Sequence, residues 1–314
     1  MNGESKNPTV SVLMNCHNSD KYLREAIDSV YAQTYKDWEI IFWDNASTDK
    51  SAEIAQSYDS KLKYFKGDEK VTLGKARNYA MAKASGEYIA FLDCDDIWLP
   101  EKLEKQLFLL RDKSIGISFT NALYFHDDMT LNYNLYDTEM KYNGMIFGDM
   151  LCKYDICLSS VILRRNILNT VGEWFYDKYN LVEDADMFLR TLYHFKAKYK
   201  YEVLTKYRIH ANNTTGLNME MLFQERIDLM RRLEEKLPLI KEKYNRSFMV
   251  YKVKTCHESL MSLWREGKKG RVVNVAISYM KVSRVFVVFI VLPFIMSYRI
   301  YNKMLSFFWR RSIF

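Results

Sequence analysis

Residues 88–96, Tyr-Ile-Ala-Phe-Leu-Asp-Cys-Asp-Asp, decide the fold of this chain. The apolar run predicts a buried strand, and Asp93, Asp95 and Asp96 follow it at once. Three carboxylates this close repel one another unless a cation holds them, and oxygen ligands suit Mg2+ or Mn2+. Ligands of open α/β sheets bind at this end of the strands. The alternative is an acidic loop that only caps the helix starting at Pro100.

Strands and helices are expected to alternate through the first third of the chain, which favours a parallel α/β sheet. β-branched and apolar runs predict the strands, and apolar residues at helical spacing predict the helices. The expected strands are residues 8–15, 38–43, 62–65 and 88–92, and the expected helices are residues 19–35, 47–58 and 74–84. Polar residues follow three of these strands, at Asn15 to Asn18, at Asp44-Asn45 and at Asp93 to Asp96.

After residue 112 the pattern is less regular. Residues 115–120 and 159–163 are expected to be strands, and a helix is expected at 182–192, with Glu183-Asp184 in its first turn. Residues 219–265 are expected to be helical and charged.

The composition supports a globular core, with 48% apolar and 15% aromatic residues among 314. The five cysteines are scattered and form no C-x-x-C pair, so neither a zinc site nor a disulfide framework is indicated. A reducing compartment fits this pattern. The first seven residues are polar, and we expect no signal peptide.

The positive charge lies in the tail. Residues 268–314 hold nine basic and no acidic residues, which leaves −2 of the net +7 for residues 1–267. The apolar run Val285 to Met296 contains Pro293 and is shorter than the about 20 residues that span a bilayer. From Arg299 the spacing predicts a basic, aromatic amphipathic helix that lies on a membrane surface. The alternatives are a helical cap or a dimer contact; nucleic acid fits less well.

Several segments together resemble the family 2 inverting glycosyltransferases, over roughly residues 8–215. The resemblance implies a GT-A fold, a Rossmann-like and mostly parallel sheet flanked by helices, and a nucleotide-sugar donor. The matching segments are residues 10–18, 32–35, 44–49, 74–78, 86–96, 159–161, 183–184 and 207–210.

The resemblance also implies site residues. Asp93 and Asp95 match the metal-binding D-x-D, in which Asp95 is the expected direct ligand. The alternative role of Asp93 is to serve the ribose or sugar of the donor. His210 matches an element near the metal and diphosphate, so the expected cofactor is Mn2+ or Mg2+. Arg77, with Lys75 as its rival, matches a basic group near the base or diphosphate.

The nucleotide is expected to meet the ends of the first two strands, at Asn15, His17, Asp44 and Asn45. Asn45 stands where the family usually has an acidic residue that contacts the base, and an amide can still accept from a pyrimidine N–H. Asn15 and His17 replace the family's usual Pro and Tyr.

Asp184 matches the general base that takes the proton from the acceptor hydroxyl. We expect the helix N-terminus beneath it to keep it ionised. The alternative is an acidic pair that only complements the helix dipole.

The sequence therefore predicts a GT-A catalytic domain at 1–217, with a nucleotide-sugar half at about 8–112 and an acceptor half at about 113–217. A helical region at 218–314 would hold a membrane-associating segment at about 281–314. The expected activity is metal-dependent transfer from a UDP-sugar, or a dTDP-sugar, to a lipid-linked glycan at the cytoplasmic face of the inner membrane. The alternatives are a sugar nucleotidyltransferase and a non-catalytic membrane-bound scaffold.

Overall fold

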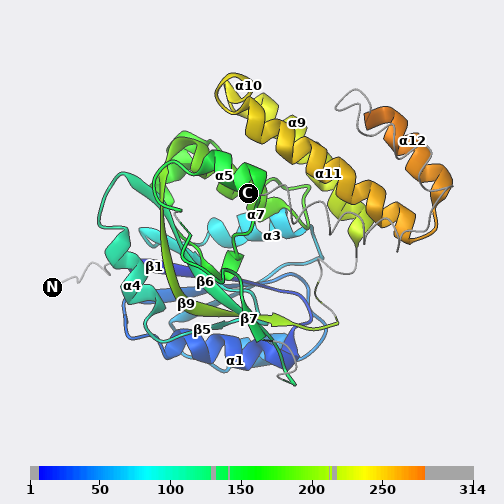
Figure 1. Cartoon of the computed structure of the whole chain (residues 1–314). Helices are drawn as coiled ribbons and strands as arrows, with labels where there is room; N and C mark the ends of the chain where they lie inside the picture. The colour runs from blue at the N-terminus through cyan, green and yellow to red at the C-terminus, as the bar shows by residue number, and fades with distance from the viewer. Residues whose placement is uncertain (1–6, 129–131, 141, 212, 214–217, 280–314) are drawn as a thin grey trace. The chain divides into compact units, whose positions relative to one another are not determined.

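A computed structural model describes residues 7–128, 132–140, 142–211, 213 and 218–279 (Figure 1). The chain divides into two units, Met1–Leu217 and Asn218–Phe314. The amphipathic and apolar segment expected at 281–314 lies outside the described residues, so its membrane role stays a prediction.

Nine strands of the first unit form one mixed sheet within the described residues. Its main path runs β3-β2-β1-β4-β8-β6-β9-β5, with β7 paired to β6. Strands β1 to β4 are parallel to one another, whereas β8 and β5 are antiparallel to their neighbours. The strands are β1 (Val10–Cys16), β2 (Trp38–Asp44), β3 (Leu62–Lys66), β4 (Tyr88–Phe91), β5 (Ile97–Trp98), β6 (Ile115–His126), β7 (Asn132–Asn134), β8 (Ile162–Arg164) and β9 (Lys196–Ile209).

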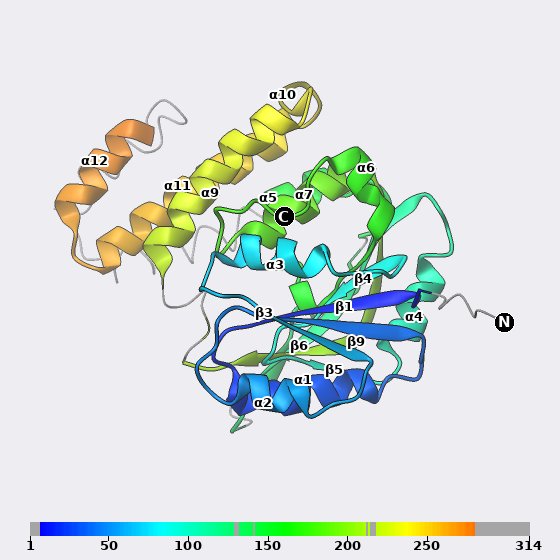
Figure 2. The same ribbon diagram turned by 180° about the vertical axis from the view of Figure 1, so that it is seen from behind.

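Helices cover both faces of this sheet. Helices α1 and α2 lie against one face, and α3, α5 and α7 lie on the opposite face, as the two views show (Figure 1, Figure 2). The helices of the first unit are α1 (Asp20–Tyr31), α2 (Ser51–Gln56), α3 (Leu73–Met81), α4 (Lys102–Leu109), α5 (Phe147–Cys152), α6 (Leu168–Val171) and α7 (Glu183–His194). Short 3-10 turns occupy Leu158–Ser160 and Arg165–Ile167.

Period-two alternation along β1 explains how the sheet is packed. Val12 and Met14 are fully buried in one core cluster with Leu23 and Ile27 of α1. Asn15 lies between Met14 and Cys16 in the pleat, so its side chain points to the opposite face. Because Val12 and Met14 are buried against α1, the side chain of Asn15 points toward the opposite face of the sheet, which α3 covers.

The predicted α/β sheet with flanking helices is confirmed. The strands predicted in the first third of the chain are present with small shifts in their bounds. The long strand β9 was not predicted, although charged residues alternate with Ala and Tyr along its first half, the pattern of a half-buried strand. Residues 159 and 160, expected in a strand, form a 3-10 turn instead.

The described part of the second unit is helical, with α9 (Met219–Lys236), α10 (Ile240–Lys243), α11 (Asn245–Arg265) and α12 (Lys269–Tyr279). The continuous helical region expected at 219–265 is broken, because Pro238 disfavours helical geometry at Leu237. Leu239 then adopts a left-handed conformation, with φ of 63°. Among the described residues, no helix combines the length and apolar character needed to cross a bilayer.

Candidate active site

The carboxyl ends of β1, β2 and β4 lie side by side. Cys16 pairs with Asp44 across β1 and β2, and Leu13 pairs with Phe91 across β1 and β4. The polar residues that follow these strands therefore gather at one edge of the sheet, as the sequence predicted.

The acidic cluster separates into an inner and an outer part. Asp96 is 1% exposed, and it accepts hydrogen bonds from Ser159 Oγ at 2.6 Å and from the Arg208 backbone N–H at 3.0 Å. Burial, together with the charges of Asp95 and Asp93, raises the pKa of Asp96 well above its usual value. Asp96 therefore ties the loop to β9, while Asp93 and Asp95 remain partly exposed.

Asp95 meets His210 although 115 positions separate them: Asp95 Oδ2 lies 2.9 Å from His210 Nε2. Arg208 Nε donates to the Asp95 carbonyl at 2.9 Å and so holds the backbone of this loop. The Arg208 guanidinium is itself anchored by Glu25 of α1 and by Asp127.

This pair fits a divalent metal ion. Two adjacent ligands of one octahedral ion, each about 2.1 Å from it, lie about 3 Å apart, close to the spacing of Asp95 and His210. One carboxylate and one imidazole are donors that Mn2+ accepts. Within the described ranges, no three His, Cys, Asp or Glu side chains converge on a single point that could hold a metal, so Asp95 and His210 are not part of a closed cage.

Arg77 of α3 connects the acidic loop to helix α7. Its guanidinium pairs with Asp93 Oδ1 at 3.3 Å and with Glu183 Oε1. Arg77 and Glu183 are almost fully buried, and burial raises the pKa of Glu183 despite the nearby Arg77 charge. Partial burial, together with the charge of Asp95, raises the pKa of Asp93 against the opposing effect of Arg77. Lys75, the predicted rival of Arg77, lies over the Tyr79 ring instead.

A close approach of α3 to the loop before α7 supports this connection. Gly74 N–H donates to the Tyr179 carbonyl at 2.9 Å, and a Cβ at position 74 would lie 2.2 Å from the Tyr176 carbonyl oxygen. Only glycine allows this contact, one turn away from Arg77.

Asp184 occupies the first turn of α7, next to Glu183. Its Oδ2 accepts a hydrogen bond from the Tyr154 hydroxyl at 3.0 Å, and its Oδ1 accepts from the Ala185 backbone N–H at 2.7 Å. Burial raises the pKa of Asp184, although Arg77, Tyr154 and the Ala185 N–H act in the opposite direction. Burial therefore has a larger effect on the pKa of Asp184 than the helix N-terminus, and the expectation that Asp184 stays ionised remains a prediction.

Hydrogen bonds within the protein hold the residues at the end of β2 in place. Asp44 is fully buried, and it accepts from the Ser47 N–H and from the Tyr64 hydroxyl, each at 2.7 Å. Asn45 exchanges two hydrogen bonds with the backbone of Val71, at 2.9 and 3.0 Å. The side chains of Asp44 and Asn45 are thus already bonded within the protein.

Asn15 and His17 differ from these two residues. His17 Nδ1 donates to the Asn45 carbonyl at 3.0 Å, which leaves Nε2 as its second polar atom. Asn15 Nδ2 is buried and has no hydrogen-bond partner in the part of the chain that the structure describes. An unpaired buried donor of this kind costs free energy.

A model of the family described as "Glycosyl transferase family 2" matches residues 11–172, which is more than half of the chain. The chain belongs to this family. It is therefore a glycosyltransferase, and this membership favours neither the nucleotidyltransferase nor the scaffold alternative. The matched residues include Asp93 and Asp95 but end before Asp184 and His210.

Relatives and solved structures agree with the family. The chain is 30% identical over 218 residues to "UDP-Glc:alpha-D-GlcNAc-diphosphoundecaprenol beta-1,3-glucosyltransferase WfaP" of Escherichia coli, covering 69% of this chain and 83% of WfaP. TarS of S. aureus in complex with UDP-GlcNAc is similar with a TM-score of 0.64 at 16% identity, covering 77% of this chain and 70% of that chain. Mannosyltransferase PcManGT from Pyrobaculum calidifontis, in complex with GDP-Man and Mn2+, gives 0.60 at 15% identity, covering 96% and 85%. These structural similarities confirm the predicted GT-A fold.

Sequence reasoning missed two polar residues of this glycosyltransferase site. Tyr154 lies in an irregular stretch with no local motif, so the sequence holds no signal for its contact with Asp184. Arg208 lies within a segment that matches the family. Its contact with the Asp95 loop joins residues far apart in the sequence, so only the folded structure reveals it.

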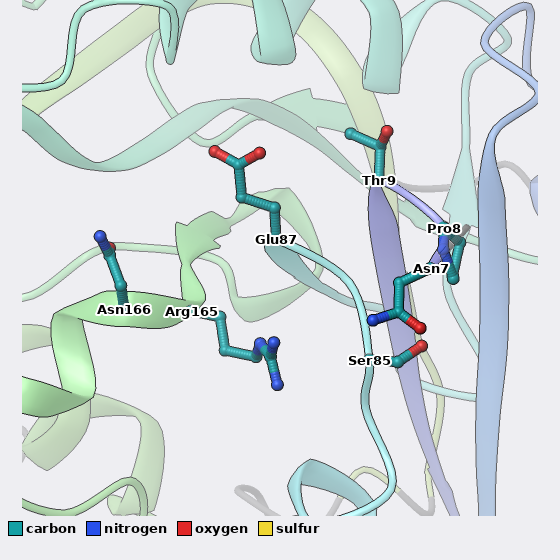
Figure 3. A pocket seen from close by; sticks show the side chains of 7 residues that line it. All are labelled: Asn7, Pro8, Thr9, Ser85, Glu87, Arg165 and Asn166. Atoms are coloured by element: carbon teal, nitrogen blue, oxygen red, sulfur yellow. The ribbon is translucent and has the colours of Figure 1, made fainter. Parts of the chain in front are cut away.

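A separate pocket of about 510 Å3 lies at the opposite ends of the strands. Its lining includes Thr9, before β1, and Ser85 and Glu87, before β4, with Arg165 across from them (Figure 3). Because the candidate site gathers at the carboxyl ends of the same strands, this pocket is distinct from it.

Proposed function

We propose that this glycosyltransferase uses a divalent metal ion to transfer a sugar from a nucleotide-sugar to a hydroxyl of a lipid-linked glycan, with inversion at the anomeric carbon. The observation that carries the proposal is the Arg77 bridge between Asp93 and Glu183, because it joins the D-x-D loop to the helix that bears Asp184. A donor-binding group and a proton acceptor then belong to one site.

The donor end of the site is assigned to the acidic loop and β9. Asp95 and His210, with Asp93 beside them, would hold Mn2+ or Mg2+, which supplies positive charge for the departing diphosphate. Arg77 keeps the Asp93 carboxylate in place, and Arg208 keeps the Asp95 backbone in place. Asp93 can alternatively accept hydrogen bonds from the donor ribose or sugar.

The acceptor end is assigned to Asp184. The acceptor hydroxyl attacks the anomeric carbon from the side opposite the diphosphate. The carbon–oxygen bond to the diphosphate breaks and its electron pair leaves with the diphosphate, while the hydroxyl proton passes to the Asp184 carboxylate. One displacement of this kind inverts the configuration. A raised pKa makes Asp184 a stronger base once it is ionised.

The nucleotide is assigned to the ends of β1 and β2, with UDP as the first choice and dTDP as the second. The buried Asn15 amide and His17 Nε2 are the polar atoms offered to the base or ribose. Asn45 would use the second lone pair of Oδ1 and the second N–H of Nδ2, because the first of each is bonded to the Val71 backbone. Asp44 would act mainly by holding the end of β2 in place through the hydrogen bonds it accepts from Ser47 and Tyr64.

The acceptor is proposed to be a glycan on a polyprenyl diphosphate, which the printed name of WfaP supports by naming a GlcNAc-diphosphoundecaprenol acceptor. The protein would work at the cytoplasmic face of the cell membrane, held peripherally by residues 281–314. Removal of residues 280–314 should release it to the soluble fraction; retention in washed membranes would contradict this attachment.

Titration calorimetry against UDP, dTDP, GDP and CDP, with and without Mn2+, tests the donor assignment. We expect UDP, or dTDP in second place, to bind, and Mn2+ to strengthen the binding. Equal binding with and without Mn2+, or a preference for GDP, would contradict the proposal.

A further inference from the structure

Tyr154 lies in the chain between α5 and the 3-10 turn at Leu158–Ser160, thirty residues before Asp184. Its hydroxyl donates a hydrogen bond to Asp184 Oδ2 at 3.0 Å. No motif of the sequence includes this residue.

The segment that carries Tyr154 is anchored by its next residue. The Tyr136 hydroxyl lies 2.8 Å from the Asp155 carbonyl and 3.1 Å from Asp155 Oδ1, so it donates to the backbone and side chain of Asp155. Lys153 pairs with Asp155 Oδ2 at 2.9 Å on the other side. The Tyr154 ring is therefore presented to Asp184 from a backbone that is already fixed.

The Asp184 carboxylate is fixed at both oxygens, by Tyr154 at Oδ2 and by the Ala185 N–H at Oδ1. Each carboxylate oxygen can accept two hydrogen bonds, so both retain one position for an incoming hydroxyl. The two existing bonds together set the plane of the carboxylate and hence the direction of that position.

We propose that Tyr154 is a positioning residue, which orients the Asp184 carboxylate toward the acceptor hydroxyl and stabilises its ionised form. This inference rests on the proposed function, in which Asp184 is the general base. Tyr154 does not itself take the proton: burial and the Asp184 charge raise the pKa of its phenol well above the usual value, so it remains a donor.

The other charged groups around Asp184 cannot replace this bond. Arg77 from α3 is the nearby cation, but its guanidinium pairs with Glu183 and Asp93. Glu183 in the same helix and Asp93 beyond β4 are acids, whose charges oppose ionisation of Asp184. Among these groups, Tyr154 is the side chain that donates directly to the base.

The first test measures the pKa of Asp184 without any substrate, by 13C NMR of protein labelled at the aspartate carboxyl carbons. The spectrum of Asp184→Asn identifies the Asp184 signal, which is then titrated in the wild type and in Tyr154→Phe. We expect a higher pKa of Asp184 in Tyr154→Phe, because a hydrogen bond to the charged form is lost. The matched control is Tyr58→Phe, which loses a 2.6 Å phenol bond to Asp28 in another part of the first unit and should leave the Asp184 signal unchanged.

The second test measures turnover. Loss of a hydrogen bond to a charged group should lower kcat of Tyr154→Phe about tenfold, with the donor KM within about twofold and the acid limb of the pH profile moved to higher pH. Substitution of 3-fluorotyrosine at position 154 keeps the ring shape and strengthens the donor, so it should move the acid limb to lower pH. If Tyr154→Phe does not fold, the 3-fluorotyrosine variant still tests the role of Tyr154.

The outcomes separate this inference from the proposed function. If Asp184→Asn keeps wild-type turnover, the base assignment and the role of Tyr154 are both overturned. If Asp184→Asn is inactive while neither variant at position 154 moves the pKa of Asp184 or the acid limb, only the role of Tyr154 is overturned.

Discussion

Asp95 Oδ2 lies 2.9 Å from His210 Nε2, and this contact joins the loop after β4 to the end of β9. It brings together a carboxylate and an imidazole that the proposed function assigns to one metal ion. The same two residues belong to different motifs in the sequence, so their contact is a property of the folded chain.

His210→Ala should weaken Mn2+-dependent binding of the nucleoside diphosphate by at least about tenfold, because it removes one of the expected ligands. Calorimetry at several Mn2+ concentrations measures the effect. His126→Ala is the control, since His126 lies at the end of β6 and is assigned no metal role. Unchanged Mn2+ dependence in His210→Ala would exclude His210 as a ligand.

Arg77→Met should lower the free energy of unfolding by about 3–5 kcal/mol, because it leaves the buried Glu183 carboxylate without its counter-ion. Urea denaturation gives this value. The control is Arg271→Met, which breaks the exposed ion pair with Glu220. Its free energy of unfolding should remain close to that of the wild type. Equal stabilities of the two variants would show that the Arg77 bridge contributes nothing beyond a surface pair.

Gly74→Ala should destabilise the protein by about 1–3 kcal/mol, because the added Cβ would overlap the Tyr176 carbonyl and push α3 away from the loop before α7. Gly270→Ala, in α12, is the matched control: a Cβ there meets nothing within 4 Å, and alanine favours a helix. Thermal unfolding compares the two, and a stable Gly74→Ala variant would mean that this close approach is not required.

Protonation of Asp184 should raise the free energy of unfolding and lower the activity, so a change of pH should move these two quantities in opposite directions. Its pKa is raised in the folded state above the usual 3.8, so its protonated form favours folding. This contribution is full below pH 3.8 and is lost as the pH rises through the raised value, whereas activity needs the ionised form and is lost as the pH falls through it.

Denaturation of the wild type and of Asp184→Asn at intervals from pH 3 to pH 7 isolates this effect, because the variant lacks the titrating group. The wild type should lose stability relative to the variant as the pH rises above 3.8. A gain in relative stability as the pH rises through this range would show that the folded-state pKa is lowered and not raised.

Much of the fold followed from local pattern. The apolar runs of β1, β2 and β4 and the helical spacing of α1 predicted the parallel half of the sheet, because these elements bury one continuous face. Strand β9 was missed although its lysines alternate with Ala197, Tyr199 and Tyr201. Its partners, β6 and β5, lie far away in the sequence, so the pairing itself could not be inferred from local pattern.

The candidate site was predictable where one short segment carries the chemistry, as in Asp93-Cys94-Asp95. The contacts between segments were not predictable. Arg77 was expected near the nucleotide, but its pairing with Glu183 joins residues 106 positions apart. The raised pKa of Asp184 depends on burial by the surrounding chain, which the helix position alone could not reveal.

The central claim is that Asp184 takes the proton of the acceptor hydroxyl in a site shared with the donor, and Asp184→Asn tests it most directly. The variant keeps the shape of the side chain, so it should bind UDP and Mn2+ as the wild type does while kcat falls by about 10²–10⁴-fold. Asp59→Asn, whose carboxylate accepts from Tyr31 away from the site, should keep wild-type turnover. Wild-type turnover in Asp184→Asn, with UDP binding intact, would contradict the account.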